Sequence, residues 1–279
     1  MTVSSLYKRA ALLLRDVSPD DYKLEADCLV KAVTGMDRQA RIIKPDAEIT
    51  TFAEEKLIEL VSKRRQGVPL QYLIGKWDFM GYEFEVGDGV LIPRPETELL
   101  VETALDYIRD KDNAVVFDLC AGSGAIGLSI AGISDKSEVW LFEKYNAAFD
   151  YLERNNRRLS LKNTKLLNYD IFNGFDSAFK KPDIIVSNPP YVKTDEIPFL
   201  QKEVGFEPVS ALDGGSDGLD FYRCIFDKWL TALDKGSLIL LECGDNQSGE
   251  VYEIFRKHCS DIGVIYDFNG IDRLVKIYV

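Results

Sequence analysis

The sequence is short of the residue types that several common chemistries require. Among its 279 residues there is one histidine, His258, and the five cysteines include no Cys-x-x-Cys pair. Because metal sites need several convergent ligands, we expect no bound metal. Basic residues are also few, 34 against 46 acidic ones, which gives a net charge of -12. This balance argues against a protein that binds a nucleic-acid backbone by charge alone.

Long apolar runs are also missing. No stretch approaches the roughly 18 consecutive apolar residues of a membrane helix, and the first ten residues lack the apolar segment of a secretory signal. With its cysteines scattered, the chain is expected to be cytoplasmic, to keep its thiols reduced and to have no membrane partner. A hydrophobic content of 46% with 29% charged residues is typical of a globular protein.

The chain begins with apolar residues at helical spacing. Leu24, Cys28, Leu29 and Ala32 recur at i, i+4, i+5 and i+8, which predicts that they share the buried face of a helix. Gly-Val-Pro-Leu at 67–70 ends a later helix. Residues 1–76 are therefore predicted to form a small helical bundle.

The pattern changes at Trp77. Aromatic and β-branched residues separated by glycines predict a β-hairpin over 77–95 that joins two domains. Over 96–279, strands and helices are expected to alternate, which indicates an α/β fold with a mostly parallel, Rossmann-like sheet. A turn at Asn269-Gly270 predicts that the last strand is antiparallel. The strands are expected at 114–119, 138–143, 164–168, 183–187, 237–242, 263–268 and 273–278.

A glycine loop follows the first of these strands. Residues 118–127 read Asp-Leu-Cys-Ala-Gly-Ser-Gly-Ala-Ile-Gly, and glycines let a backbone approach a ligand closely. The spacing of Gly122, Gly124 and Gly127 fits the dinucleotide fingerprint, which is a weak signal alone, and a plain strand-to-helix connection fits it too. Asp118 favours a different ligand. A carboxylate there would repel a pyrophosphate and attract the sulfonium and ammonium groups of S-adenosylmethionine.

Two further acids extend this candidate cofactor site. Glu143 ends the next strand, where a carboxylate can accept both ribose hydroxyls, as it does in dinucleotide and S-adenosylmethionine sites alike. Asp170 follows the third strand and could face an adenine amino group while Ile171 packs on the ring, although a simple turn aspartate fits equally well. A dehydrogenase would lack a proton-handling group, because the only Tyr-x-x-x-Lys match, at 107–111, precedes the loop.

The stretch Ser-Asn-Pro-Pro-Tyr-Val at 187–192 follows the fourth strand. Two prolines cannot continue a central strand, because they offer no N–H and fix φ. The side-chain carbonyl of Asn188 and the backbone carbonyl of Pro189 could then accept the two N–H bonds of a planar amide or amine. Tyr191 could stack on that group, so that positioning supplies most of the catalysis. The alternative is a strand-ending turn with a buried tyrosine.

These motifs resemble those of a known family, the release-factor-specific protein-(glutamine-N5) methyltransferases. The resemblance covers nearly the whole chain. Asn-Pro-Pro-Tyr is shared with N6-adenine methyltransferases, whereas the 91–98 segment together with the helical domain is far more specific. The matching segments are Pro-Leu-Gln-Tyr-Leu-Ile-Gly at 69–75, Leu-Ile-Pro-Arg-Pro-Glu-Thr-Glu at 91–98, the glycine loop, Asn-Pro-Pro-Tyr at 188–191, Phe-Glu-Pro at 206–208, Glu-Cys-Gly at 242–244 and Asp-Arg at 272–273.

The resemblance implies methyl transfer from S-adenosylmethionine to the glutamine of the Gly-Gly-Gln motif in class I peptide chain release factors. It implies a substrate-docking domain at 1–76, a hairpin linker at 77–95, a methyltransferase domain at 96–279 and a docking wall at 193–221. We expect a monomer that binds no nucleic acid directly. The implied cofactor residues are Asp118, Cys120, Ala121, Gly122, Ser123, Gly124, Glu143, Asp170, Ile171 and Asn188. The implied substrate residues are Asn188, Pro189, Pro190 and Tyr191, with Asn188, Pro189 and Tyr191 as the catalytic ones.

Three positions depart from the family pattern. Cys120 replaces a glycine, Glu143 replaces a commoner aspartate, and Ile171 stands where some relatives have an aromatic residue. Because a cysteine disfavours positive φ, the first turn of the loop is expected to differ slightly. Two alternatives stay open: an N6-adenine methyltransferase on DNA or RNA, which would need a basic and aromatic groove, and a non-catalytic protein that keeps the fold.

Overall fold

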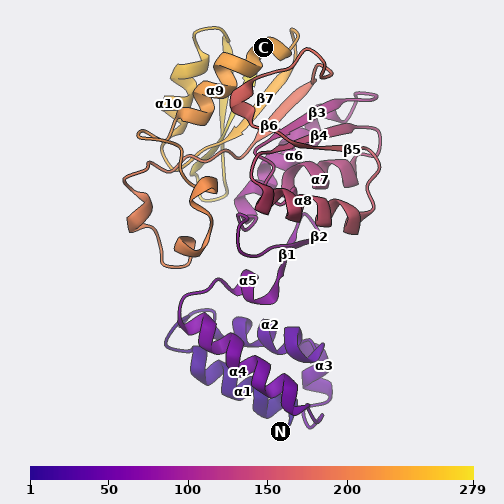
Figure 1. Ribbon diagram of the computed structural model, residues 1–279, viewed down its shortest axis with the longest axis vertical. Coiled ribbons are helices and arrows are strands. Elements are labelled where there is room, and N and C mark those ends of the chain that lie inside the picture. The colour runs from indigo at the N-terminus through magenta and orange to yellow at the C-terminus, as the bar shows by residue number, and fades with distance from the viewer. The chain divides into compact units, whose positions relative to one another are not determined.

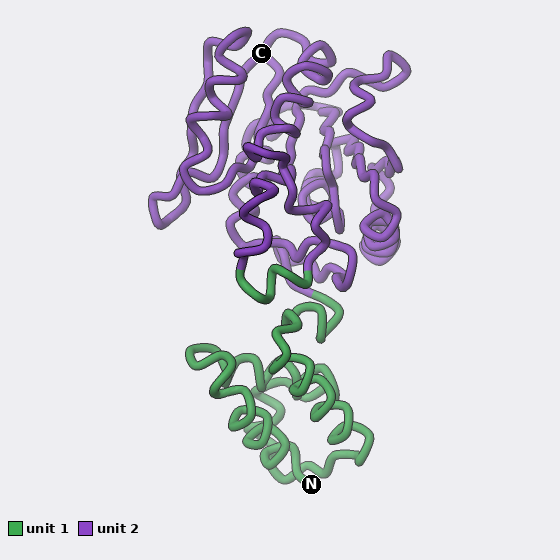
Figure 2. Tube along the Cα trace, turned by 60° about the vertical axis from the view of Figure 1, so that its left-hand side comes forward, with its two compact units in different colours: residues 1–76, 201–206 green, residues 77–200, 207–279 purple.

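The computed structural model describes residues 1–279, which divide into two compact units. Unit 1 comprises residues 1–76 together with 201–206, and unit 2 comprises residues 77–200 and 207–279 (Figure 2). Residues 201–206 thus group with the N-terminal helices, and the hairpin groups with the α/β sheet. None of the helices combines the length and apolarity needed to cross a membrane.

Unit 1 is built from five helices around one apolar core, to which Leu6, Leu29 and Leu57 contribute. The helices have caps that explain where they start. The Thr2 side chain accepts from the Ser5 N–H, and the Thr50 side chain accepts from the Ala53 N–H at 3.1 Å. The helices, shown in indigo to purple in Figure 1, are α1 (Val3–Leu14), α2 (Tyr22–Thr34), α3 (Arg38–Ile43), α4 (Thr51–Arg65) and α5 (Leu70–Ile74).

Helix α2 forms where the sequence predicts it, and the predicted buried face is confirmed in part, since Leu29 is buried in the core and Cys28 packs against it. Leu24 and Ala32 are exposed, and the buried side carries Glu25 instead. The Glu25 carboxylate accepts hydrogen bonds from Arg64 of α4 at 2.9 and 2.8 Å. Arg64 also donates to Glu203 at 2.7 Å, which ties the 201–206 segment to unit 1. A salt bridge thus replaces an apolar contact in this core.

The hairpin that opens unit 2 consists of β1 (Lys76–Phe79) and β2 (Tyr82–Glu85). Its turn is Met80-Gly81, and both residues have positive φ, 51° and 76°, as a type I′ hairpin turn requires. Phe79 and Phe84 are buried in the same core cluster as helices and strands of the large sheet. The hairpin therefore packs as part of unit 2.

The large sheet of unit 2 has seven strands in the order β5-β4-β3-β6-β7-β9-β8. Strands β3 to β7 pair in parallel, and β9 is antiparallel to both of its neighbours. All predicted strands are confirmed, with ends within two residues of the expected ones. The strands are β3 (Val115–Leu119), β4 (Glu138–Glu143), β5 (Thr164–Asn168), β6 (Ile184–Ser187), β7 (Leu238–Glu242), β8 (Asp261–Tyr266) and β9 (Asp272–Tyr278).

Helices cover both faces of this sheet, which explains why its central strands read as continuous apolar runs. On one face, α6 (Glu98–Ile108), α7 (Ala125–Ile133) and α8 (Asn146–Leu159) build one core cluster. On the other, α9 (Asp220–Trp229) and α10 (Ser248–Phe255) build a second cluster around Trp229. Figure 1 shows the two groups of helices on opposite sides of the strands.

The strand order creates a switch point between β3 and β6. The chain leaves β3 toward β4 and β5, then returns to form β6 on the other side of β3. The loops that follow β3 and β6 therefore start side by side at the carboxyl edge and diverge. In open α/β sheets this is where ligands bind.

The salt bridge in unit 1 generates a test of its packing. Arg64→Met leaves the Glu25 carboxylate buried without its partner, so the free energy of unfolding of unit 1 is expected to fall by about 3 kcal/mol. In the double variant Glu25→Met/Arg64→Met, most of that loss is expected to be recovered, because two apolar side chains of similar length then meet. Urea unfolding followed by circular dichroism measures both. Equal losses in the single and double variants would contradict this account.

Candidate functional site

A cavity that is partly open to solvent lies at the carboxyl edge of β3, β4 and β6. Many of the predicted site residues line it: Cys120, Ala121, Gly122, Ser123, Glu143, Asp170, Ile171, Asn188 and Pro190. The other predicted residues do not line it: Asp118, Gly124, Pro189 and Tyr191. The structure thus brings the glycine loop, the two strand-end acids and Asn188 together around one space.

The glycine loop runs from Cys120 to Gly124. Cys120, Gly122 and Gly124 have φ of 66°, 56° and 85°. The expectation that Cys120 would keep a negative φ is wrong. Backbone hydrogen bonds from Ala121 to Phe142 O at 2.9 Å and from Gly124 to Ala121 O at 2.8 Å fix the path of the chain. The cysteine therefore adopts the left-handed conformation at a cost of about 1 kcal/mol, rather than altering the turn.

Glu143 lies at the end of β4 beneath this loop. One carboxylate oxygen accepts the Gly122 N–H at 2.9 Å, and the other accepts the Tyr145 N–H at 2.8 Å. Burial raises the pKa of Glu143, and these backbone N–H groups oppose that rise. Each oxygen keeps a second lone pair, and the residue lines the cavity. Glu143 is therefore placed to accept hydroxyl groups of a ligand.

Asp118 has a different place from the one expected. Its carboxyl is fully buried, one oxygen accepts the Gly127 N–H at 2.8 Å, and the other has no partner. Burial, with a smaller contribution from Glu143, raises the pKa of Asp118 to about 8. The predicted attraction between an Asp118 carboxylate and a cationic ligand does not follow from this geometry. The side chain holds the first turn of α7 instead.

Asp170 and Ile171 lie just after the end of β5 and line the cavity. The Asp170 carboxylate accepts from Lys144 at 2.9 Å and from the Phe172 N–H at 3.0 Å. Burial alone would raise the pKa of Asp170, but these two hydrogen bonds outweigh it and lower the pKa. Ile171 is buried, and its carbonyl accepts the Trp229 indole N–H at 2.8 Å. An ionised acid thus lies beside a fixed apolar surface, which suits a planar base with an amino group.

Strand β6 ends at the cavity. The Ser187 hydroxyl donates to the Leu119 carbonyl at 2.5 Å, which joins the ends of β6 and β3. The next residue, Asn188, is half-buried, lines the cavity and donates from Nδ2 to Thr97 Oγ1 at 3.3 Å. Pro189 is buried and does not line the cavity. Of the four residues in the motif, Asn188 and Pro190 face the space.

Tyr191 does not line the cavity. Its backbone carbonyl accepts the Gln247 side-chain amide at 3.3 Å, and its ring lies against Gly244, where a Cβ would approach ring atom Cδ2 to 3.2 Å. Burial, with Glu242 nearby, raises the pKa of Tyr191 to about 12. The predicted stacking of this ring on a substrate is therefore not preformed in the structure.

Four residues of the 91–98 segment line the cavity without having been assigned to the site: Leu91, Pro93, Arg94 and Thr97. Thr97 contacts Asn188, and Arg94 forms an ion pair with Glu207. The Glu207 side chain is buried and also accepts the Ile92 N–H at 3.0 Å. This clamp holds the start of the 207–211 stretch, which lines the cavity at Pro208, Ser210 and Ala211. The only sequence signal for these residues was the match of their motifs to the family.

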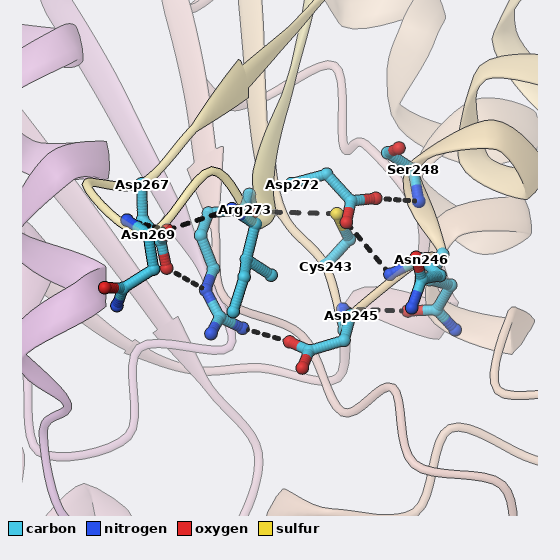
Figure 3. Close-up of polar contacts among 11 residues, drawn as sticks. Cys243, Asp245, Asn246, Ser248, Asp267, Asn269, Asp272 and Arg273 are labelled. Carbon is cyan, nitrogen blue, oxygen red and sulfur yellow. Dashed lines mark hydrogen bonds and ion pairs between the residues drawn. The ribbon is translucent and has the colours of Figure 1, made fainter.

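The loop between β7 and α10 is held by the Asp-Arg pair of β9. The Asp272 carboxylate accepts the Asn246 and Ser248 N–H groups at 2.9 and 3.1 Å (Figure 3). Arg273 donates to Asp245 at 2.5 Å and to Asp267 at 3.0 Å. This loop carries Gln247, which is buried and fixes the Tyr191 carbonyl. By holding this loop, Asp272 and Arg273 also hold Gln247 in the position where it binds the Tyr191 carbonyl.

Comparison with known proteins identifies the family. Residues 5–75 match the PrmC N-terminal domain, and residues 80–206 match the family described as conserved hypothetical protein 95. The release factor glutamine methyltransferase of Clostridium acetobutylicum is 36% identical over 278 residues, 99% of this chain and 98% of that protein. Those of Clostridium botulinum and Thermodesulfovibrio yellowstonii are 34% and 38% identical over 95% and 90% of this chain, and 94% and 90% of theirs. The chain belongs to the release factor glutamine methyltransferase family.

Solved structures agree on the fold. The catalytic domain of hMettl16, solved in complex with a MAT2A 3′UTR hairpin, superposes with a TM-score of 0.58 at 13% identity, covering 81% of each chain. The chain is thus a methyltransferase of a fold and family that use S-adenosylmethionine. The cavity fits that cofactor. Glu143 offers acceptors for ribose hydroxyls, and Asp170 and Ile171 suit adenine. The space beside Gly122 is open, because a Cβ there would have no atom closer than 4.0 Å, so a ligand can approach the backbone of the loop.

The buried Asp118 predicts a pH dependence of stability. An unfolded aspartate loses its proton near pH 3.8, whereas the folded one keeps it to about pH 8. Between these values the folded chain binds the extra proton, so stability falls as pH rises. Asp118→Asn keeps an acceptor for the Gly127 N–H and removes this titration.

The free energy of unfolding, measured at pH 6, 7 and 8, is expected to fall less steeply with pH in Asp118→Asn than in the wild type, by up to about 1.4 kcal/mol per pH unit. The matched control is the exposed Asp112→Asn, which should retain the wild-type slope. Parallel curves for the wild type and Asp118→Asn would refute the assignment of this titration to Asp118.

Proposed function

We propose that the protein transfers the methyl group of S-adenosylmethionine to the side-chain amide nitrogen, N5, of the glutamine in the Gly-Gly-Gln motif of class I peptide chain release factors. The observation that carries the proposal is Asn188: it lines the cavity at the switch point of the sheet while its amide nitrogen is engaged by Thr97. The names of the relatives support the choice of substrate. The reaction would take place in the cytoplasm, where translation occurs.

Positioning supplies the catalysis in this proposal. An amide nitrogen is a weak nucleophile because its lone pair is delocalised into the carbonyl. Acceptors on its N–H bonds hold the nitrogen in line with the transferred methyl group and favour a pyramidal geometry. The side-chain oxygen of Asn188 is one acceptor, and the Pro189 carbonyl stays the predicted second one. The cofactor supplies an electrophilic methyl group on a sulfonium.

The proton balance needs no general base on this chain. The new N–C bond forms as the C–S bond breaks, and the nitrogen becomes positively charged and strongly acidic. It then releases one proton to solvent and recovers a neutral, methylated amide. Tyr191 is an unsuitable base, because burial raises the pKa of its hydroxyl to about 12.

The docking of the release factor is assigned to two regions. Unit 1 is the proposed docking domain, and the 193–221 stretch is the proposed wall beside the cavity, with Phe199 and Val209 exposed on it. The net charge of -12 suits a partner whose glutamine lies in a basic loop. The protein is proposed to act as a monomer.

The substrate is tested by offering labelled S-adenosylmethionine with three acceptors. These are a release factor, the same factor with its Gly-Gly-Gln glutamine changed to alanine, and a mixture of DNA and RNA. Label is expected in the unchanged factor alone. Label in nucleic acid would establish the N6-adenine alternative, and equal label in both factors would exclude the glutamine as the acceptor.

The role of Asn188 is tested by Asn188→Ala. Turnover on the release factor is expected to fall by about 100- to 1000-fold, because an acceptor that positions the nitrogen is lost. Binding of S-adenosylmethionine, measured by calorimetry, should change little. Asn168→Ala, at the exposed end of β5, is the control and should be unaffected. A parallel loss of cofactor binding in Asn188→Ala would assign Asn188 a structural role.

A further inference from the structure

Asn155 is a buried polar residue outside the motifs that mark the site. It lies on α8 and is 0% exposed, which is rare for an asparagine unless its amide is hydrogen-bonded. Its Oδ1 atom accepts the Glu85 N–H at 2.6 Å. Its Nδ2 atom donates to the Glu85 carbonyl at 3.1 Å and to the Ser123 carbonyl at 2.9 Å. Both hydrogens of the amide nitrogen are therefore used.

The direction of the Asn155 amide is fixed by these partners. A backbone N–H only donates, so the Glu85 N–H must face the side-chain oxygen. The two carbonyls only accept, so they must face the side-chain nitrogen. A flipped amide would lose all three hydrogen bonds and place its oxygen against two carbonyls. The three contacts therefore define one orientation.

The first partner, Glu85, is the last residue of β2. Asn155 binds both its N–H and its carbonyl, as the backbone of a neighbouring strand would. The chain then continues through Val86, which is buried against Ala148 of α8, to residues 89–91, which line the cavity. Asn155 therefore fixes the point from which the 89–91 stretch leaves the hairpin.

The second partner, Ser123, belongs to the glycine loop and also lines the cavity. It lies between Gly122 and Gly124, whose φ values are 56° and 85°. Glycines have several accessible backbone conformations, so the peptide group between 123 and 124 needs contacts to fix its orientation. Asn155 binds the carbonyl of this group, and its N–H donates to Ala121 O at 2.8 Å. The group is thus fixed at both ends.

The two segments that Asn155 joins lie opposite each other. The nearest atom to a Cβ built on Gly122 is Val90 Cγ2, at 4.0 Å. We infer that Asn155 is a positioning residue, which holds the glycine loop and the 89–91 stretch at the separation that the cofactor requires. A site ordered in advance binds more tightly, because the cost of ordering is not met during binding. This inference rests on S-adenosylmethionine as the cofactor and is independent of the proposed methyl acceptor.

The first test compares two substitutions of Asn155. Asn155→Leu has a similar size and removes all three hydrogen bonds, whereas Asn155→Asp keeps the acceptor for the Glu85 N–H and removes both donors. The Kd of S-adenosylhomocysteine, measured by calorimetry, is expected to rise about tenfold in each, because both segments must then be ordered on binding. The kcat at saturating S-adenosylmethionine is expected to stay within about twofold of the wild type.

Both variants are expected to keep the hairpin in place. Two ion pairs, Arg154 with Glu85 at 3.3 Å and Arg158 with Glu83, also join α8 to β2. The matched control is Asn156→Leu. Asn156 is half-buried, and its Oδ1 accepts the Thr164 hydroxyl of β5 at 2.9 Å. Its loss should leave the Kd within about twofold of the wild type.

The second test needs neither cofactor nor substrate. Amide hydrogen exchange of the cofactor-free protein, measured by mass spectrometry, is expected to become faster at residues 86–91 and 120–124 in both Asn155 variants. The rest of the sheet should exchange as in the wild type. Asn156→Leu should show no change in either segment.

The outcomes separate this inference from the proposed function. A raised Kd with faster exchange in the two segments alone supports the positioning role. An unchanged Kd in both Asn155 variants would overturn it, and so would faster exchange throughout the sheet, which would make Asn155 a general stabilising residue. A wild-type protein that binds S-adenosylhomocysteine but does not methylate the release factor would refute the proposed substrate and leave the role of Asn155 standing.

Discussion

Strand β6 cannot extend past Ser187, because the two prolines at 189 and 190 have no N–H to donate to a neighbouring strand. The end of β6 is therefore fixed in the middle of the sheet, between β3 and β7. The loop after β3 lines the cavity from one side of this strand end. Asn188, the first residue after β6, therefore lies at the carboxyl edge of the sheet, where its amide contacts Thr97.

Buried carboxyl groups hold the loops around this edge. Asp118 fixes the start of α7, Glu143 fixes the glycine loop, Glu207 fixes the 91–94 segment, and Asp272 fixes the loop after β7. Each accepts backbone N–H groups, which a turn leaves without partners. Burying an acid is costly unless it is hydrogen-bonded, so these contacts define single conformations. The acidic composition of the chain has, in part, this structural use.

The fold could be predicted because its strongest sequence signals follow directly from burial and from backbone geometry. Strands that are buried on both faces read as apolar runs, and Asn269-Gly270 favours a tight turn between two strands. The inward face of α2 could be predicted only in part, because Glu25 enters the core only through its pairing with Arg64, 39 residues away. The loop conformation at Cys120 also depended on partners, Phe142 and Ala121, that local propensity does not include.

The site was predicted in part. Glu143, Asp170 and Asn188 were placed correctly around one cavity, because strand ends of a parallel sheet converge. Asp118 was expected to act on the ligand directly and instead lies under the loop, since a position within a strand does not reveal how deep its side chain will be buried. Thr97 was missed as a site residue for a similar reason: a lone threonine gives no signal until its partner Asn188 is known.

The most direct test of this account is a crystal structure with S-adenosylhomocysteine and a Gly-Gly-Gln peptide, at a resolution that distinguishes nitrogen from oxygen. The account predicts that the peptide glutamine nitrogen lies within hydrogen-bonding distance of the Asn188 side-chain oxygen, and that Asn188 Nδ2 still donates to Thr97. A glutamine held by Asn188 Nδ2, or bound away from Asn188, would contradict it.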